Sequence, residues 1–275
     1  MFDAGRTLQA APAHTDRARS NPRAAKCCVI LSPHPDDECI AGGLPLRLLR
    51  EQGWRVVNIA ITQGSKPERQ LARAQELAAA CDRLGFENIF LAPRGLQRVS
   101  EHSRQFDPAH WVACVQALAP HIARLRPDLI VLPHPQDAQA AHIGTHLLGL
   151  DVLAQQPAAY TPWVAFSEFW STMASPNLMV QISPQDLGDL VAALMEHEGE
   201  IRRNPYHLCL PAWMMDNVRR GAEQVGLPGS PAPDFMFATL YRVMRWQGGA
   251  LQPAWETGRF AATGMPVLDL APDPA

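Results

Sequence analysis

The sequence predicts an α/β protein with a Rossmann-like, three-layer α/β/α architecture and a mostly parallel sheet. Short apolar segments typical of buried strands alternate with longer segments whose apolar residues recur at helical spacing. This alternation favours a parallel sheet built through right-handed crossovers. Polar side chains also follow two of the predicted strands directly, where open α/β sheets place their ligands.

The first predicted strand, 27–31, is a run of small and apolar residues that Pro33 stops. A helix follows over about 38–52, where apolar residues recur at helical spacing, and Gly53 ends it. The same patterns predict the remaining elements. We expect strands at 55–62, 89–91, 128–133, 164–170 and 235–246, helices at about 108–125 and 184–203, and two more helices that end near 84 and 153.

The chain of 275 residues suits one large globular domain or two small ones, and we assign residues 25–250 to a single domain. Residues 1–24 mix Ala, Pro, Arg and Ser without a period and predict a flexible extension. Residues 251–275 are assigned to a C-terminal tail. The segments 93–107 and 204–234 lack a period and predict surface loops, the second of them long.

The composition excludes several function classes. Net charge is −3 at pH 7, so neither a nucleic-acid footprint nor an electrostatic membrane anchor is indicated. The six cysteines form no C-x-x-C pair, which favours a reducing compartment. No signal segment is visible, and no run approaches the roughly 18 apolar residues of a membrane span. We therefore expect a soluble, cytoplasmic protein without nucleic-acid or integral membrane contacts, whose oligomeric state leaves no signal in the sequence.

The most informative stretch is Ser32-Pro33-His34-Pro35-Asp36-Asp37-Glu38, a tight loop between the first strand and the first helix. Imidazole and carboxylate side chains together suit a divalent metal ion, with zinc the first choice. Capping is the alternative, because acidic residues at a helix start satisfy free N–H groups and complement the helix dipole. Capping accounts for one or two such acids, but less readily for three that follow His-Pro.

A second polar cluster follows the predicted strand 128–133 and runs from His134 to His146. The carboxyl ends of parallel strands meet at one edge of a sheet, so the two clusters can come together there. His34 and Asp37 with one histidine of the second cluster would supply three protein ligands, as in a catalytic zinc site. The two clusters together favour a metal site over capping.

The His-Pro-Asp-Asp-Glu loop after a buried strand resembles that of the PIG-L/LmbE-like N-acetylglucosaminyl deacetylases, a family of zinc-dependent de-N-acetylases. That family includes enzymes of glycosylphosphatidylinositol, mycothiol and bacillithiol synthesis and several antibiotic-sugar deacetylases. The resemblance covers about residues 27–245. Further matching motifs are Gly42-Gly43, Thr62-Gln63-Gly64, Arg73-Ala74-Gln75-Glu76, Leu84-Gly85 and His142-Ile143-Gly144-Thr145-His146, with weaker matches at Pro176-Asn177-Leu178 and His197.

The resemblance implies one zinc ion held by three ligands: His34, Asp37 and His142. It also implies that Asp36 is the general base that takes a proton from the attacking water. Arg73 is implied to lie near the far end of the substrate. Its alternative is a charge on the helix surface, paired with Glu76.

The chain departs from the family pattern in the second cluster. The family's usual His three residues before the third ligand is Gln139 here, and the Asp just before that ligand is Ala141. A glutamine can donate a hydrogen bond but cannot shuttle a proton. His134 and His146 are the positional candidates for that task. We assign Gln139 and His134, together with Arg73, to substrate binding.

These features predict a zinc-dependent hydrolase that removes the acetyl group from an N-acetylated amino sugar of the GlcNAc type, nucleotide-linked or glycan-linked. Two alternatives stay open. One is a metal hydrolase of another amide or a phosphoester, and the other is a sugar-binding homologue with impaired catalysis, which Gln139 and Ala141 motivate. The group attached to the sugar is expected to meet the irregular segments 93–107 and 204–234.

Overall fold

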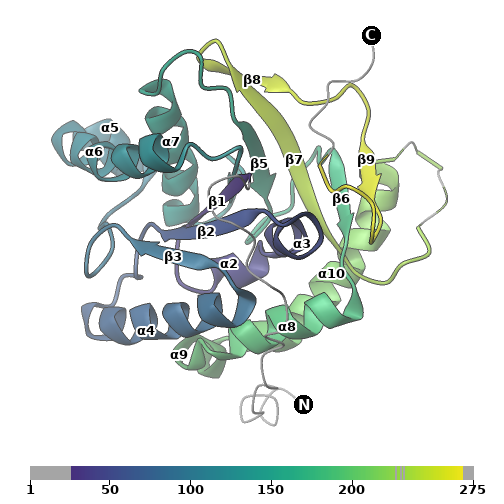
Figure 1. Cartoon of the computed structure of the whole chain (residues 1–275). Coiled ribbons are helices and arrows are strands. Elements are labelled where there is room, and N and C mark those ends of the chain that lie inside the picture. Colours follow the sequence, from purple (N-terminus) through teal and green to yellow (C-terminus); the bar gives the residue numbers. More distant parts are fainter. Residues whose placement is uncertain (1–25, 227, 230, 232, 269–275) are drawn as a thin grey trace.

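The computed structural model describes residues 26–226, 228, 229, 231 and 233–268, and its centre is one nine-stranded sheet (Figure 1). The strand order is β3-β2-β1-β4-β5-β7-β6-β9, and β8 pairs with β7. The first five strands of this order are parallel, whereas β7 runs antiparallel to both β5 and β6. The parallel strands are β1 (Cys27–Ser32), β2 (Arg55–Ala60), β3 (Glu87–Phe90), β4 (Leu129–Pro133) and β5 (Trp163–Ser167), and the others are β6 (Leu178–Gln181), β7 (Ala238–Gln247), β8 (Ala250–Pro253) and β9 (Arg259–Ala261).

Helices cover both faces of the sheet, which gives the predicted three-layer α/β/α fold and confirms the predicted fold class (Figure 1). One face carries α2 (Asp37–Ile40), α3 (Gly43–Gln52), α4 (Pro67–Leu84), α8 (Pro184–Met195), α9 (Glu198–Arg203) and α10 (Tyr206–Gln224). The other face carries α5 (Glu101–Phe106), α6 (Pro108–Leu125) and α7 (Ala140–Ala154).

Strand β1 shows how the sheet separates two hydrophobic cores. Its side chains alternate, so Cys28 and Ile30 join the core beneath α3, α4 and α8. Val29 and Leu31 join the core beneath α6 and α7. Every residue of β1 is buried, as expected for a strand that is covered on both faces.

The two polar clusters meet at the switch point of the sheet. After β1 the chain crosses to β2 on one side, and after β3 it returns to place β4 on the other side of β1. Parallel pairing of β1 with β4 brings together the loops that follow both strands. This crevice at the carboxyl ends of the strands is where open α/β sheets bind ligands.

Two predicted helices are interrupted in the structure. The predicted helix 38–52 consists of α2 and α3, and Gly42 between them lets α8 approach, since a Cβ there would lie 2.8 Å from the Leu190 side chain. The predicted helix 184–203 consists of α8 and α9. The break lies at His197, whose ring is drawn into a buried hydrogen bond with Glu38.

The prediction of a long surface loop over 204–234 is wrong, because α10 occupies more than half of it. Its buried residues Leu210, Met214 and Val218 recur every fourth position, which is helical spacing. Pro211 inside the helix and the neighbouring prolines and glycines obscure that period in the sequence. The segment 93–107 is also partly helical, because it contains α5.

The structure describes part of the predicted C-terminal tail but none of the predicted N-terminal extension. The predicted N-terminal extension, 1–24, lies outside the described residues. The predicted tail, 251–275, begins inside β8, and β9 pairs with β6 at the edge of the sheet. Residues up to Ala261 therefore contribute to the fold, and short strands with few apolar residues gave no clear signal for them.

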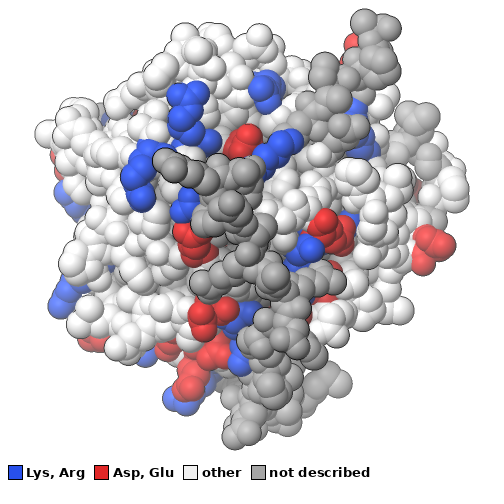
Figure 2. All heavy atoms as spheres, in the orientation of Figure 1, with Lys and Arg blue, Asp and Glu red and all other residues white. Residues whose placement is uncertain are grey.

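Figure 2 shows one face of the molecule, on which acidic and basic side chains lie close together in the lower half and basic ones predominate above. Many of the described charges are paired, for example Arg50 with Asp186 and Asp189 at 2.6 and 2.8 Å. None of the described helices combines the length and the apolar character that crossing a lipid bilayer requires.

Candidate active site

The loop after β1 is held by hydrogen bonds from its own side chains and backbone. The Thr62 hydroxyl donates to the Pro33 carbonyl at 2.7 Å, and the His34 N–H donates to Asp37 Oδ2 at 2.9 Å. Asp36 has φ 111°, a conformation that non-glycine residues rarely adopt. Its backbone N–H donates to Glu38 Oε2 at 2.9 Å, which supports this strained turn.

Three side chains form a nearly equilateral triangle at the bottom of this loop. Asp37 Oδ2 lies 3.4 Å from His34 Nδ1 and 3.4 Å from His142 Nε2, and the two ring nitrogens lie 3.3 Å apart. Ligand atoms of a tetrahedral zinc site, with bonds of about 2.0–2.1 Å, lie about 3.3–3.4 Å from one another. Two imidazoles and a carboxylate are also a usual zinc donor set. The predicted ligands are therefore brought together at a spacing that fits zinc.

His142 is oriented by a carboxylate that the sequence analysis did not single out. Its Nδ1 lies 3.6 Å from Asp137 Oδ1, and no closer hydrogen-bond partner of this nitrogen is found among the described residues. Asp137 is itself fixed, because it accepts the N–H groups of Gln139 and Trp170 at 3.1 Å. A carboxylate behind a ligating histidine sets the tautomer and orientation of the ring. Its place in the second polar cluster was the available signal.

The charges of the triangle favour a cation at its centre. Burial opposes the ionised form of Asp37, but His142 and His34 lower the pKa of this carboxyl below its usual range. Burial likewise opposes protonation of His142, but Asp37 and Asp137 raise the pKa of this imidazole. Negative carboxylates around two imidazoles therefore attract a proton, and a metal ion would compete for the same position.

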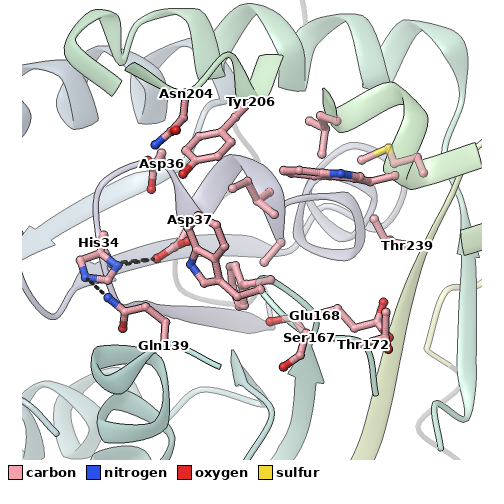
Figure 3. A pocket seen from close by; sticks show the side chains of 18 of the residues that line it. His34, Asp36, Asp37, Gln139, Ser167, Glu168, Thr172, Asn204, Tyr206 and Thr239 are labelled. Carbon is pink, nitrogen blue, oxygen red and sulfur yellow. Dashed lines mark hydrogen bonds and ion pairs between the residues drawn. The ribbon is translucent and has the colours of Figure 1, made fainter. Parts of the chain in front are cut away.

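Asp36 lies next to the triangle but is not part of it. Figure 3 shows Asp37 turned toward His34, whereas Asp36 lies on the side of Asn204 and Tyr206. Burial and the neighbouring Asp37 raise the pKa of Asp36 well above its usual range, although Arg73 at 3.7 Å acts against this. A carboxylate with a raised pKa beside a metal site suits proton transfer. Asp36 makes no side-chain capping bond to α2, so capping does not explain it.

Glu38 and His197 form a completely buried pair behind the loop. His197 Nε2 and Glu38 Oε1 lie 2.7 Å apart, and the other Glu38 oxygen accepts the Asp36 N–H. With Cys39, this pair is a second group whose atoms are close enough to share a metal ion. Both Glu38 oxygens and His197 Nε2 are already engaged in hydrogen bonds, so the pair serves to hold the strained turn at Asp36.

Gln139 begins α7 and has its amide fixed by that helix. Its Oε1 accepts the backbone N–H groups of Ala141 and His142, so its NH2 group is directed to the other side. That nitrogen lies 3.4 Å from His34 Nε2 and faces the pocket described below (Figure 3). Gln139 thus has one donor group available for a substrate.

His134 and His146 are buried on the protein side of the site. His134 Nδ1 accepts the Gln136 N–H at 3.3 Å, and its Nε2 lies 2.9 Å from the Ser171 carbonyl. His146 Nδ1 lies 2.9 Å from the Pro133 carbonyl. Neither ring lines the pocket, although the sequence placed His134 with the substrate-binding residues. Both rings instead hold the backbone around the end of β4.

Arg73 is not a surface charge. It is buried, it donates to the Pro35 carbonyl at 2.8 Å, and it lies 3.8 Å from Glu200. Glu76, the partner that the alternative proposed, pairs with Arg69 at 3.0 Å. A side chain at Gly64 would collide with the Arg73 guanidinium, so this glycine makes room for it. Arg73 therefore reaches the loop after β1 from α4 and lines the pocket.

The triangle opens into a pocket of about 520 Å³, a volume in the range of ordinary small-molecule sites. His34, Asp36, Asp37 and Gln139 form one end of it (Figure 3). Its outer walls come from the segment after β5 and from α9 and α10. We expected substrate contacts from a surface loop at 204–234. This segment does line the pocket, but through the helix α10.

The fold and the triangle define a three-layer α/β protein with a three-ligand candidate metal site at its switch point. The model of the PIG-L family, described as GlcNAc-PI de-N-acetylase, matches residues 29–153 of this chain. That segment contains all the residues of the triangle and also Asp36 and Gln139. The match confirms the resemblance to the PIG-L family that the His-Pro-Asp-Asp-Glu loop predicts.

A curated relative from Acidothermus cellulolyticus, 1D-myo-inositol 2-acetamido-2-deoxy-alpha-D-glucopyranoside deacetylase, is 29% identical over 174 residues. The match spans 51% of this chain and 60% of the relative, so it covers less than two thirds of that protein.

Two solved structures share the fold at low sequence identity. N,N'-diacetylchitobiose deacetylase from Pyrococcus horikoshii is 18% identical, with a TM-score of 0.57 over 82% of this chain and 87% of that one. GalB, the 4-carboxy-2-hydroxymuconate hydratase from Pseudomonas putida, is 17% identical, with a TM-score of 0.58 over 79% and 95%. Proteins with this fold therefore include both a deacetylase and a hydratase, so the fold alone does not define the reaction.

Proposed function

We propose that this protein is a zinc-dependent hydrolase that removes the acetyl group from an N-acetylated amino sugar of the GlcNAc type. The observation that carries the proposal is the triangle of His34, Asp37 and His142, with Asp36 beside it and a pocket above it. The relatives named above, two of which are sugar deacetylases, support the choice of substrate. The PIG-L family match over residues 29–153 supports the reaction.

His34, Asp37 and His142 would hold the zinc ion, which would supply Lewis-acid activation of water and of the acetyl carbonyl. Asp36 takes a proton from the attacking water as the oxygen bonds to the acetyl carbon. Its raised pKa makes it a stronger base than an exposed aspartate. When the carbon–nitrogen bond breaks, the proton passes from Asp36 to the leaving amine, so acetate and a free amino sugar result.

Three further residues of the chain orient this reaction. Asp137 holds the His142 ring, and Glu38 holds the backbone of Asp36. The NH2 group of Gln139, which also contacts His34 Nε2, is the donor that faces the pocket for the acetamide oxygen. Because an amide does not titrate, it can orient the substrate without taking part in proton transfer.

Acetate release tests the proposal directly. Purified protein loaded with one equivalent of zinc is incubated with GlcNAc, with N,N'-diacetylchitobiose and with a phenyl N-acetylglucosaminide, and both acetate and primary amine are quantified. Equal amounts of the two products support amide hydrolysis, whereas the Asp36→Asn variant should release neither above background. Release of phenol from the phenyl glycoside instead of acetate would assign the site to another hydrolysis.

A sugar-binding protein without turnover is the second candidate, and Gln139 favours it. This residue occupies the position of a family histidine, and His134 is engaged with backbone groups in the described structure. Only Asp36 is then left to move the proton. Saturable binding of N,N'-diacetylchitobiose to the zinc-loaded protein, without any acetate release, would favour this candidate over the hydrolase.

A further inference from the structure

Three aromatic side chains form one wall of the pocket, outside the metal triangle. Trp170 follows β5, and Tyr206 and Trp213 lie on α10. The Trp170 and Tyr206 ring centres are 5.9 Å apart, and those of Tyr206 and Trp213 are 6.1 Å apart. We call these three residues the ring wall. Their spacing and tilt are those of interacting aromatic rings.

The two tryptophans of the ring wall are open to solvent, whereas Tyr206 between them is buried. Trp170 is 56% exposed and Trp213 is 39% exposed, which is unusual for tryptophan in a position that packs against other rings. Tyr206 and Trp213 are seven residues apart and so lie on the same side of α10. Apolar area of this kind is stabilised when a ligand ring covers it.

The pocket continues beyond the triangle, since residues of β7 and of the segment after β5 also line it. In Figure 3, His34 and Gln139 lie at one end, while Thr172 and Thr239 lie at the opposite side of the same pocket. Tyr206 lies between these ends. A sugar whose acetamide reaches the triangle would therefore extend its attached group along the ring wall.

Carboxylates already lie beside the arginines that line the pocket. Arg220 lies 2.6 Å from Glu168 and 3.0 Å from Asp216. Arg203 pairs with Glu200. Burial would raise the pKa of Glu200, but nearby arginines, Arg203 first among them, lower it below its usual range.

Arg73 lies between Asp36 and Glu200, at 3.7 and 3.8 Å. Each of the three arginines that line the described pocket therefore has a carboxylate partner within the pocket.

We infer that the ring wall binds an uncharged cyclic group linked to the amino sugar, and that the pocket selects against phosphate-linked sugars. This inference rests on the proposed function. Strong phosphate recognition uses guanidinium groups that no carboxylate neutralises, whereas each of these three arginines lies beside a carboxylate. These carboxylates would repel the phosphate. A second sugar ring or a phenyl ring needs only the exposed aromatic faces and neutral hydrogen bonds.

Four probes test the selection: GlcNAc, N,N'-diacetylchitobiose, phenyl N-acetylglucosaminide and GlcNAc-1-phosphate. We expect kcat/KM to be at least about tenfold higher for the two uncharged glycosides than for GlcNAc, the size of one good apolar contact. GlcNAc-1-phosphate should be no better than GlcNAc. Dissociation constants from calorimetry with the Asp36→Asn variant should show the same order.

Two variants connect the selection to the ring wall. Trp213→Ala should lower kcat/KM for the two glycosides about tenfold, and that for GlcNAc much less. Phe106→Ala is the matched control, because Phe106 is 65% exposed on α5 and lies outside the pocket. It should change no ratio between probes.

The possible outcomes separate this inference from the proposed function. Acetate release with equal kcat/KM for all four probes, or with a preference for GlcNAc-1-phosphate, would overturn the inference while leaving the deacetylase intact. Without acetate release from any probe, the proposed function fails. The dissociation constants then decide the inference alone, and equal values for all four probes would refute it.

Discussion

The two halves of the pocket are built in opposite ways. The inner half, around the triangle and Asp36, is largely buried, and neighbouring groups fix its side chains. His142 is fully buried and faces Asp137, and the backbone of Asp36 is held by Glu38. The outer half is half-exposed, and its rings come from a segment after β5 and from a distant helix. The inner half is thus preorganised for one reaction, while the outer half can change its ligand without disturbing the fold.

The largest effect should come from the base in the inner half. Asp36→Asn keeps the shape of the loop and removes proton transfer, so we expect kcat to fall by about 10²–10⁴-fold. Zinc content should stay at the wild-type level, because Asp36 lies outside the triangle. Steady-state acetate release and metal analysis on the same preparation check both statements. Full activity of this variant would exclude Asp36 as the base.

Removing the support of a ligand should weaken the inner half more mildly. Asp137→Asn leaves all three ligands in place, but it replaces the carboxylate that faces the His142 ring with a neutral amide. We therefore expect zinc affinity to fall about 10–100-fold. Competition with a chromophoric chelator measures this. Asp151→Asn in α7 is the matched control, since Asp151 contacts Arg104 and Trp111 and does not line the pocket. Equal losses in both variants would show that the effect is general destabilisation.

The inner half should also lose its metal at a characteristic pH. Asp37 and Asp137 raise the pKa of His142 above its ordinary value of 6.5, in spite of burial. A raised pKa means that the metal-free site binds a proton more readily, so zinc affinity should decline as the pH falls through that raised value. In Asp137→Asn one cause of the raised pKa is gone, and the decline should begin at a lower pH. The same pH dependence in both proteins would argue against this coupling.

The smallest effect on chemistry is expected at His134. His134→Ala leaves the Gln136 N–H and the Ser171 carbonyl without their partner, so the free energy of unfolding should fall by about 1–3 kcal/mol. The pH–rate profile should keep its shape, because His134 does not line the pocket. Thermal unfolding and the profile are measured together. Loss of an ionisation from the profile would instead identify His134 as a helper acid.

The same contrast explains what could be predicted from the sequence. The inner half follows from local patterns: an apolar strand, a proline and a loop of His and Asp define His34, Asp36 and Asp37 within seven residues. The partner His142 required only the rule that ligands gather at the carboxyl ends of parallel strands. The parallel part of the fold was also predictable from local patterns, because its strands are short apolar segments and its helices show apolar residues at helical spacing.

The outer half depends on long-range packing and could not be read locally. Trp170 and Trp213 are about forty residues apart, and the sequence placed Trp170 at the end of a predicted strand and Trp213 in a predicted surface loop. The helix α10 was hidden by Pro205 and Pro211, and the strand β6 by its shortness. Asp137 was visible in the second cluster, but only the folded geometry shows that it faces His142.

The zinc content of three proteins purified side by side tests the central claim most directly. Wild type and Asp36→Asn should each hold about one zinc ion per chain, whereas Asp37→Ala should hold little, because it loses one of three ligands. Adding one equivalent of zinc should restore acetate release only in the wild type. Wild-type protein that takes up no zinc, or equal loss of zinc in both variants, would contradict the assignment of the triangle as the metal site.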